Sequence, residues 1–526
     1  MARFSQMAGK DFSSALTYHE ATKHSEVSIG ASAHYLDWDS KPALFKEYKN
    51  LPSIALPRDF SRPEVNSIKA IKDEEKDIGD KRIDIGVLSE LLFFSAGLTR
   101  KVRFGKEFYY MRAASATGAL YPIELYVISG RIPGLEAGVY HFNPLHFSLV
   151  KLREGDYRAS LDDAGSVDSL FAPFTLAFTS LAWRNAWKYE ARSYRHWFWD
   201  SGVIVANLLA TSNSAGIATE AILGFVDSEI DELLGLEAKK EATVALAVVG
   251  TDPHPKALRL HQPIPSLAIE SNPLSSEEVD YPIIWETNEA SQLRSKSETE
   301  AWVKSLRLSK GTIPTTSPAF PLRAWEEDLS PPLDEVILIR GSARKFAREP
   351  ISFDRLSTIL QTSATKIPLD FLPDNETLID FYLIANDVQG LPPGSYFYNV
   401  NTNSVEQLKV LKNRSMSGYL CLGQQLFSDA SVVFFLMTNL NSVLKSLGNR
   451  GYRAAQFEAG VRAGKIYLSS YAVGIGASGS TFFDDAVTEF FTPHAIAKSP
   501  MIAVGVGVPA YKARSGKVLP QMTTMS

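Results

Sequence analysis

The sequence predicts an α+β fold that occurs twice within one chain of 526 residues. A segment that starts at Ser193, SYRHWFWDSGVIVANLLATSNSAGIATEAILGFVD, matches GYRAAQFEAGVRAGKIYLSSYAVGIGASGSTFFDD, which starts 258 positions later at Gly451. Further upstream, IELYVISGRIPGLEAGVYHFN matches LIDFYLIANDVQGLPPGSYFYN at an offset of 256. A repeat of about 250 residues is too long for a solenoid unit, so each copy is predicted to be a domain.

The order of elements is the same in both copies. Each begins with a strand, a glycine-containing turn and a second strand, and then has an apolar strand, FTLAFTSL in the first copy and SVVFFLMTN in the second. A long helix follows and ends at Gly216 or Gly474. The final strands are TVALAVVG and MIAVGVGV, and the repeat also aligns Asp227 with Asp485. Alternating strands and helices of this kind predict an α+β domain in each copy.

The flanking segments set the predicted boundaries. Residues 1–75 show little periodicity and are expected to form an arm that lies over one domain. Residues 76–261 form the first domain and residues 334–526 the second. Between them, residues 262–333 are rich in proline and serine, which indicates a linker without continuous regular structure.

Composition excludes several classes of partner. The formal net charge is −5 and the chain has no long run of Lys and Arg, so neither nucleic acid nor an anionic membrane is an expected partner. Cys421 is the only cysteine, which leaves no intrachain disulfide and no cysteine-based metal site. The first residues lack a signal-peptide core, and no apolar run approaches ~18 residues. We therefore expect a cytoplasmic protein without a metal or a membrane span.

Several motifs together resemble one family. ALTYHEATKHSE, RAASATGALYPIELYV and WKYEARSYRHWFWDSGVIVANLLATSNSAGI are similar to SagB-type dehydrogenases, the thiazoline/oxazoline oxidase branch of the FMN-dependent nitroreductase superfamily. In the second half, IRGSARKFAREPISFDRLSTIL resembles the opening of a nitroreductase domain. The resemblance implies a central sheet flanked by helices, usually in a homodimer with two FMN sites at the shared interface. Two tandem nitroreductase-like domains would then form an intramolecular pseudo-dimer.

Two basic segments are candidate phosphate ligands. Arg340, Ser342 and Arg344 precede a predicted helix, and two guanidiniums with a hydroxyl at a helix entrance suit a phosphate monoester, although a solvated basic turn would look the same. Lys512 and Arg514 follow the final strand, where the family commonly places further phosphate ligands; a basic tail is the alternative. At the place of the Arg-x-Ser-x-Arg element, the first half has KDEEKDIGDKRIDIG.

The first half instead carries a loop of small residues, RAASATGALYP, with Arg112, Ser115, Thr117 and Gly118 as candidate flavin-binding residues. Such a loop lets the backbone approach a flat ring and supplies amides and hydroxyls to its polar edge. The family more often has its serine one position later, where this chain has Ala116. The second half has FLPDNETL at that place, so the two losses are complementary and predict one composite FMN site.

Lys188 and Tyr189 match the Lys-Tyr pair that is thought to act as the acid–base group in azoline oxidases. Forming an azole requires a ring proton to leave, and a lysine desolvated among aromatic side chains, or a tyrosine beside a cation, could accept it. The alternative is an amphipathic pair on a surface helix. The second copy has Ser446 and Leu447 at these positions.

GIGASGSTFF, residues 474–483, resembles the turn from which a backbone amide approaches flavin N5, with Ser478 and Gly479 as candidates. A plain turn at a helix end fits the glycines equally well. Taken together, the sequence predicts an FMN-dependent oxidoreductase that acts on a small molecule or a modified peptide. It oxidises an azoline with oxygen as the final acceptor, or reduces a nitro or quinone compound with NAD(P)H. A non-catalytic binding or scaffold protein is the alternative from another class.

Overall fold

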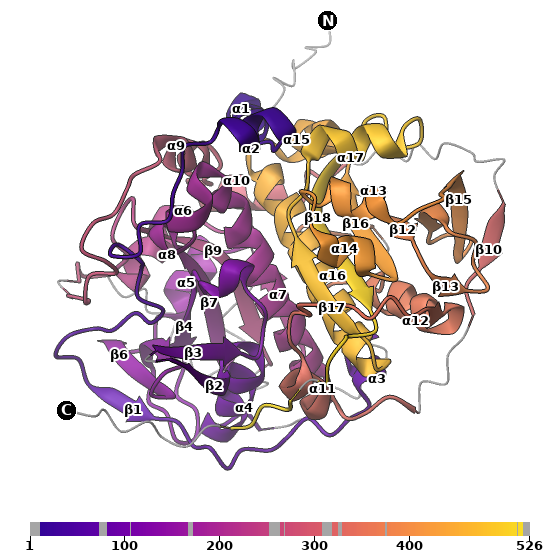
Figure 1. Ribbon diagram of the computed structural model, residues 1–526. Helices are drawn as coiled ribbons and strands as arrows, with labels where there is room; N and C mark the ends of the chain where they lie inside the picture. The colour runs from indigo at the N-terminus through magenta and orange to yellow at the C-terminus, as the bar shows by residue number, and fades with distance from the viewer. Residues whose placement is uncertain are drawn as a thin grey trace, which may run out of the picture.

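The computed structural model describes residues 11–72, 82–105, 107–166, 172–251, 264–267, 269–307, 318–323, 329–373, 376–512 and 514–518. Figure 1 shows two halves side by side, with the first in purple and the second in orange and yellow. The long helices α7 (Ser193–Ser214) and α16 (Arg450–Ala472) run next to each other where the halves meet.

Each half contains a seven-stranded sheet, and the strand orders correspond: β1-β6-β5-β4-β7-β9-β8 in the first and β10-β15-β14-β12-β16-β18-β17 in the second. All neighbouring strands in these two sheets are antiparallel. The strands of the first sheet are β1 (Ser53–Ala55), β4 (Ile123–Ser129), β5 (Gly138–Asn143), β6 (Ser148–Glu154), β7 (Phe174–Leu181), β8 (Thr219–Ile222) and β9 (Glu241–Val249). Those of the second are β10 (Ala319–Pro321), β12 (Asp380–Ala385), β14 (Gly394–Asn399), β15 (Ser404–Val410), β16 (Val432–Thr438), β17 (Gly476–Ser480) and β18 (Ser499–Gly507). The predicted duplication of an α+β domain is confirmed.

Helices surround each sheet. The first half has α3 (Ser67–Lys72), α4 (Ile85–Ala96), α5 (Arg158–Ala164), α6 (Ala182–Tyr189), α7 and α8 (Asp227–Leu234). The second half has α11 (Leu333–Ile339), α12 (Phe353–Ser363), α13 (Ser415–Leu420), α14 (Gln425–Asp429), α15 (Leu440–Leu447), α16 and α17 (Asp484–Phe491). Two short sheets complete the fold, a hairpin of β2 (Leu98–Phe104) and β3 (Glu107–Arg112) and a parallel pair of β11 (Ile351–Ser352) and β13 (Val388–Gln389).

The two central helices touch through glycines. A Cβ atom on Gly202 would lie 2.6 Å from the Phe457 carbonyl oxygen, and one on Gly460 would lie 2.7 Å from the Phe198 and Trp199 carbonyl oxygens. Only residues without a side chain allow two helix backbones to approach so closely. The pair of repeated glycines therefore sets the crossing of α7 and α16, and the intramolecular pseudo-dimer is built around it.

Pseudo-symmetric ion pairs tie each half to the other. Asp484 of the second half contacts Arg192 and Arg195 of the first at 2.9 and 2.8 Å. In the first half, Asp227 likewise accepts from Arg450 and Arg453 of the second, both at 2.6 Å. These carboxylates begin α17 and α8, so the structural partner of Asp227 is Asp484, one residue before the Asp485 that the constant offset aligns with it.

The N-terminal segment contacts both halves. The ring of Tyr18 in α1 (Ser13–Ala21) packs edge-on against Tyr194 of α7 and Tyr452 of α16. The short helix α2 (Glu26–Ala31) follows, and β1 then joins the edge of the first sheet beside β6. We expected this arm over a single domain, but the tyrosine pairs show that it bridges the two.

The connecting segment contains regular structure. Residues 282–290 form α9 (Pro282–Ala290), residues 296–303 form α10 (Lys296–Val303), and β10 adds to the second sheet beside β15. Proline at the first turn of α9 is compatible with a helix start, which explains how a proline-rich stretch can contain one. At the other end of the chain, residues 514–518 return to the first half, where the Lys517 amide donates to the Thr99 carbonyl at 2.9 Å.

Candidate functional site

A loop of small residues in the first half faces the start of α7. The Thr117 amide donates to the Asp200 carboxylate at 2.9 and 3.0 Å, and the Thr117 hydroxyl donates to it at 2.8 Å. Gly118 has φ +63°, and a Cβ atom there would lie 2.7 Å from the Tyr189 hydroxyl oxygen. The glycine is therefore required twice, by its backbone conformation and by the approach of the phenol.

Lys188 and Tyr189 stand at the C-terminal end of α6, which stops because Glu190 has φ +48°. The Lys188 side chain is half-buried, and its pKa is lowered by burial first and by the positive charge of Arg344 second. Arg344 belongs to the second half, so its charge reaches a helix of the first. The structure thereby brings together a predicted acid–base residue and a predicted phosphate ligand from opposite halves.

Tyr189 remains a neutral phenol in this setting. Burial first and the Asp200 carboxylate second raise the pKa of Tyr189 to about 12, against the opposing charge of Arg344. Its ring packs edge-on against His196 with 4.7 Å between centroids. Of the two groups considered as a base, the environment favours the neutral amine of Lys188 and the protonated phenol of Tyr189.

The residues of the Arg-x-Ser-x-Arg segment have different surroundings. The Arg340 guanidinium is buried and donates to the main-chain carbonyls of Arg112 at 2.6 Å and Ala113 at 2.8 Å. Ser342 is partly exposed, and Arg344 is exposed. Arg340 thus fastens the second half to the small-residue loop, while Ser342 and Arg344 keep donors that can meet a ligand.

The segment after the last strand contacts the segment that carries Arg344 and contains two more cations. The Tyr511 hydroxyl accepts from the Arg344 amide at 2.9 Å, and the Ala510 amide donates to the Lys345 carbonyl at 3.0 Å. These contacts lay the segment after β18 along residues 343–347. Lys512 is adjacent to Tyr511 and exposed, as is Arg514. The main chain just before Lys512 therefore runs beside the segment that carries Arg344.

Ser478 and Gly479 lie on strand β17 and not in a turn, because the turn ends at Ile475. Ser478 is buried, whereas Gly479 is exposed and its amide donates to the Tyr467 hydroxyl at 2.5 Å. The same hydroxyl lies 3.2 Å from the Ser342 hydroxyl. Tyr467 of α16 thus joins two of the predicted ligands, and nothing in the sequence motif indicated it.

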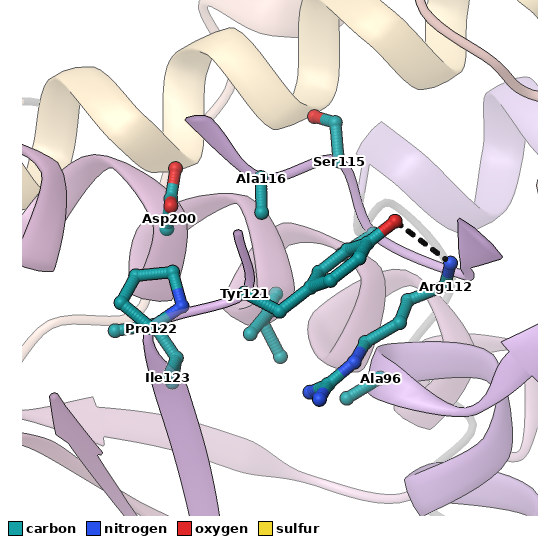
Figure 2. A pocket seen from close by; sticks show the side chains of 10 residues that line it. Ala96, Arg112, Ser115, Ala116, Tyr121, Pro122, Ile123 and Asp200 are labelled. Atoms are coloured by element: carbon teal, nitrogen blue, oxygen red, sulfur yellow. Dashed lines mark hydrogen bonds between the residues drawn. The ribbon is translucent and has the colours of Figure 1, made fainter. Parts of the chain in front are cut away.

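A pocket lies behind the small-residue loop and is shown in Figure 2. Its lining comprises Ala96, Arg112, Ala114, Ser115, Ala116, Tyr121, Pro122, Ile123, Asp200 and Ile204. The Arg112 guanidinium points away from Ser115, donates to the Leu44 carbonyl at 3.3 Å and lies over the Tyr121 ring. Burial lowers the pKa of Arg112 to about 10. Arg112 therefore has an internal partner, and Ser115 stays partly exposed at the loop.

The equivalent region of the second half is filled. Residue 204, which lines the pocket, is isoleucine, and 258 positions later Arg462 is buried and donates to the Ser363 and Thr365 carbonyls at 2.9 and 2.6 Å. Lys465 adds a bond to the Thr365 hydroxyl at 2.8 Å. A long cationic side chain, Arg462, thus stands in the second copy where Ile204 lines the pocket of the first.

Each of the two halves separately matches a known family. Residues 80–251 and 337–508 each match the model described as the nitroreductase family. The chain belongs to the nitroreductase family. As such it is an oxidoreductase built from two family domains in tandem.

Individual relatives are similar to parts or all of this chain. The chain is 31% identical to the trifolitoxin-processing protein TfxB of Rhizobium leguminosarum over 193 residues, covering 35% of this chain and 52% of TfxB. It is 25% identical to the microcin B17-processing protein McbC of Escherichia coli over 243 residues, covering 44% of this chain and 84% of McbC. The crystal structure of a nitroreductase-like protein from Anabaena variabilis superposes on 95% of this chain and all of that one, with a TM-score of 0.73 and 26% identity. That agreement extends over both halves and so covers the tandem arrangement.

The described residues offer neither a membrane-spanning helix nor a cluster of metal ligands. Within the ranges given above, no helix has the length and apolar character of a membrane span. In the same part of the chain, no group of at least three His, Cys, Asp or Glu side chains is arranged to hold a metal ion.

Proposed function

We propose that the chain binds one FMN between its halves and dehydrogenates an azoline ring in a modified peptide. The residues present fit the cofactor. Ser342 and the exposed Arg344, Lys512 and Arg514 form a donor set of the kind that a phosphate monoester requires. Gly118 and Ser115 from the first half present backbone and hydroxyl groups for a ring, whereas the Gly479 amide of the second half is already engaged by the Tyr467 hydroxyl.

Composite geometry supports a single site. The first half offers the loop and the Lys188–Tyr189 pair, and the second offers the cations. In the reciprocal arrangement, Arg462 stands where Ile204 lines the pocket of the first half, and residues 446 and 447 are Ser and Leu. Since only one combination carries both parts, we expect a stoichiometry of one FMN per chain.

Lys188 and Tyr189 would handle protons at the substrate. Converting an azoline into an azole removes one proton and one hydride equivalent from the ring. When bound, FMN supplies a two-electron acceptor. The lowered pKa of Lys188 favours its neutral amine, which can accept the ring proton, while the Tyr189 phenol keeps its proton and can donate a hydrogen bond to the substrate.

The surroundings of Lys188 and Tyr189 favour an azoline substrate over the other substrates of the family. Lys188 and Tyr189 stand on one helix end beside the loop, with the charge of Arg344 from the other half acting on both. The relatives named as trifolitoxin- and microcin B17-processing proteins support a peptide substrate, because both names describe the maturation of peptides. A cytoplasmic location is proposed from the sequence alone.

The test is a spectrum followed by turnover. The purified protein is titrated with FMN for stoichiometry, and the loaded protein is mixed in air with a peptide that contains a thiazoline or oxazoline. Loss of two hydrogen mass units from the peptide is the expected result. Rapid anaerobic bleaching of the flavin by NAD(P)H without any change in the peptide would instead identify a nitro or quinone reductase.

A further inference from the structure

Asp200 is a buried carboxylate without a basic partner among the described hydrogen bonds and ion pairs. Both of its oxygens share the Thr117 amide hydrogen in a bifurcated bond, and one of them also accepts from the Thr117 hydroxyl. Burial raises the pKa of Asp200, and the neighbouring side chain of Asn185 in α6 opposes that shift. The position of Asp200 on α7 thus connects two separate elements, the small-residue loop and helix α6.

Asn185 continues the chain of contacts toward Tyr189. Its side-chain nitrogen lies 3.3 Å from Nδ1 of His196, whose ring packs edge-on against Tyr189. Burial lowers the pKa of His196 well below its usual range, so the ring is neutral. Nδ1 then accepts from the amide nitrogen, which fixes the orientation of the imidazole behind the phenol. We call Asp200, Asn185, His196 and Thr117 the Asp200 network.

The second half shows what happens to this network where no composite site exists. At the positions of Asn185, Tyr189 and His196 it has Val443, Leu447 and Ala454, all buried. The carboxylate and its threonine partner are retained, as Glu458 and Thr377. Glu458 accepts from the Thr377 hydroxyl at 2.6 Å and the Leu378 amide at 2.8 Å, in the loop before β12, but it is paired with Arg462 at 2.9 Å.

This contrast separates a structural requirement from a functional one. In both halves a carboxylate fastens the loop to the long helix. In the second half, where this role is only structural, Glu458 has a buried cation, Arg462, and apolar neighbours. Leaving a buried carboxylate without a cation is unfavourable, since desolvation disfavours its charge. The first half tolerates that cost at the one place where the loop, Lys188 and Tyr189 come together.

We propose that Asp200 is a positioning residue of the composite site, which holds the Thr117–Gly118 loop and, through Asn185 and His196, the Tyr189 phenol in register with each other. The inference rests on the proposed function for its catalytic meaning, but not for its geometry. Thr117, expected to offer its hydroxyl to a cofactor, has both of its donors directed at Asp200 and so serves the loop. The charge of Asp200 acts on Tyr121 and Tyr189, and Arg112 lines the same pocket.

The first experiment needs no cofactor. Amide hydrogen exchange of Thr117 is measured in the FMN-free protein for the wild type, Asp200→Asn and Asp200→Ala. We expect exchange to become about tenfold faster or more in Asp200→Ala, the scale of losing a hydrogen bond to a charged group. Unchanged protection of Thr117 in Asp200→Ala would overturn the proposal.

The second experiment uses the FMN-loaded protein and a matched pair of variants. Thr117→Val and Thr377→Val each remove one hydroxyl from a carboxylate, the first at the composite site and the second at its counterpart. We expect Thr117→Val and Asp200→Asn to lower kcat on the azoline peptide about tenfold with KM nearly unchanged, and Thr377→Val to match the wild type. Equal kcat in all four proteins would refute the positioning role. A wild type that binds no FMN would instead refute the proposed function, while the exchange experiment would still decide the role of Asp200.

Discussion

Lys188 and Arg344 come from opposite halves of the chain, yet the positive charge of Arg344 lowers the pKa of the Lys188 amine. The proposed base and the proposed phosphate-binding cation therefore influence each other only because the two domains are folded against each other. The relationship defines which half contributes which part, and the following predictions depend on it.

Replacing Lys188 by Ala, or Tyr189 by Phe, is expected to lower turnover of an azoline peptide about 100-fold or more, because a group that transfers or holds a proton is lost. FMN affinity should stay within a few-fold of the wild type. Steady-state kinetics and flavin fluorescence measure the two quantities. Lys445→Ala, at an exposed lysine on the corresponding helix of the second half, is the control and should behave as the wild type. Near-normal turnover of both site variants would remove the pair from the mechanism.

The double variant Arg344→Ala/Lys512→Ala should weaken FMN binding by about 100-fold, since each charged hydrogen bond to a phosphate contributes about 1.5–3 kcal/mol. Thermal unfolding of the FMN-free protein should hardly change, because both side chains are exposed. Arg340→Ala should behave differently and lower the unfolding temperature without FMN, since its buried guanidinium holds the carbonyls of Arg112 and Ala113. Half of the flavin remaining in the double variant would argue for a second site.

Stability should depend on pH through Asp200. Burial raises the pKa of Asp200 from 3.8 to about 7, so the folded state binds a proton more tightly than the unfolded chain. The resulting stabilisation is present below about pH 4 and is lost as the pH rises through about 7. A shift of this size corresponds to at most about 4 kcal/mol.

Asp200→Asn removes that titration. Its free energy of unfolding relative to the wild type should increase between pH 5 and pH 8, as measured by denaturant unfolding at both values. A difference that is independent of pH would show that Asp200 is ionised throughout. Asp200→Asn is expected to gain global stability at pH 8, which slows exchange through global unfolding. Faster exchange of the Thr117 amide in this variant at pH 8 would therefore report local opening of the loop.

Gly202→Ala should disrupt the junction between the halves, because the added Cβ would lie 2.6 Å from backbone atoms of α16. The helices would have to separate, and we expect a loss of several kcal/mol in the free energy of unfolding. Gly30→Ala is a suitable control, since a Cβ there meets no atom within 4 Å. An equally stable Gly202→Ala protein would mean that the junction can relax.

The sequence by itself determined the duplication, the α+β class and the complementarity of the two halves. These features are written in local patterns: the repeat of glycines and apolar runs, the Arg-x-Ser-x-Arg segment in one copy only, and the small-residue loop and Lys188–Tyr189 in the other. Periodicity and residue type suffice for them because they depend on neighbours within a few positions.

Only the tertiary structure decided what each side chain contacts. Arg340 and Arg344 belong to one motif, but packing buries the first against main-chain carbonyls and leaves the second exposed. Asp200 and Tyr467 were not singled out, because nothing around them in the sequence distinguishes them from other residues of a buried helix. Their roles follow from partners 83 positions away in Thr117 and 12 positions away in Gly479. Burial and hydrogen bonding between distant segments fix these contacts, and a pattern of adjacent residues contains no information about them.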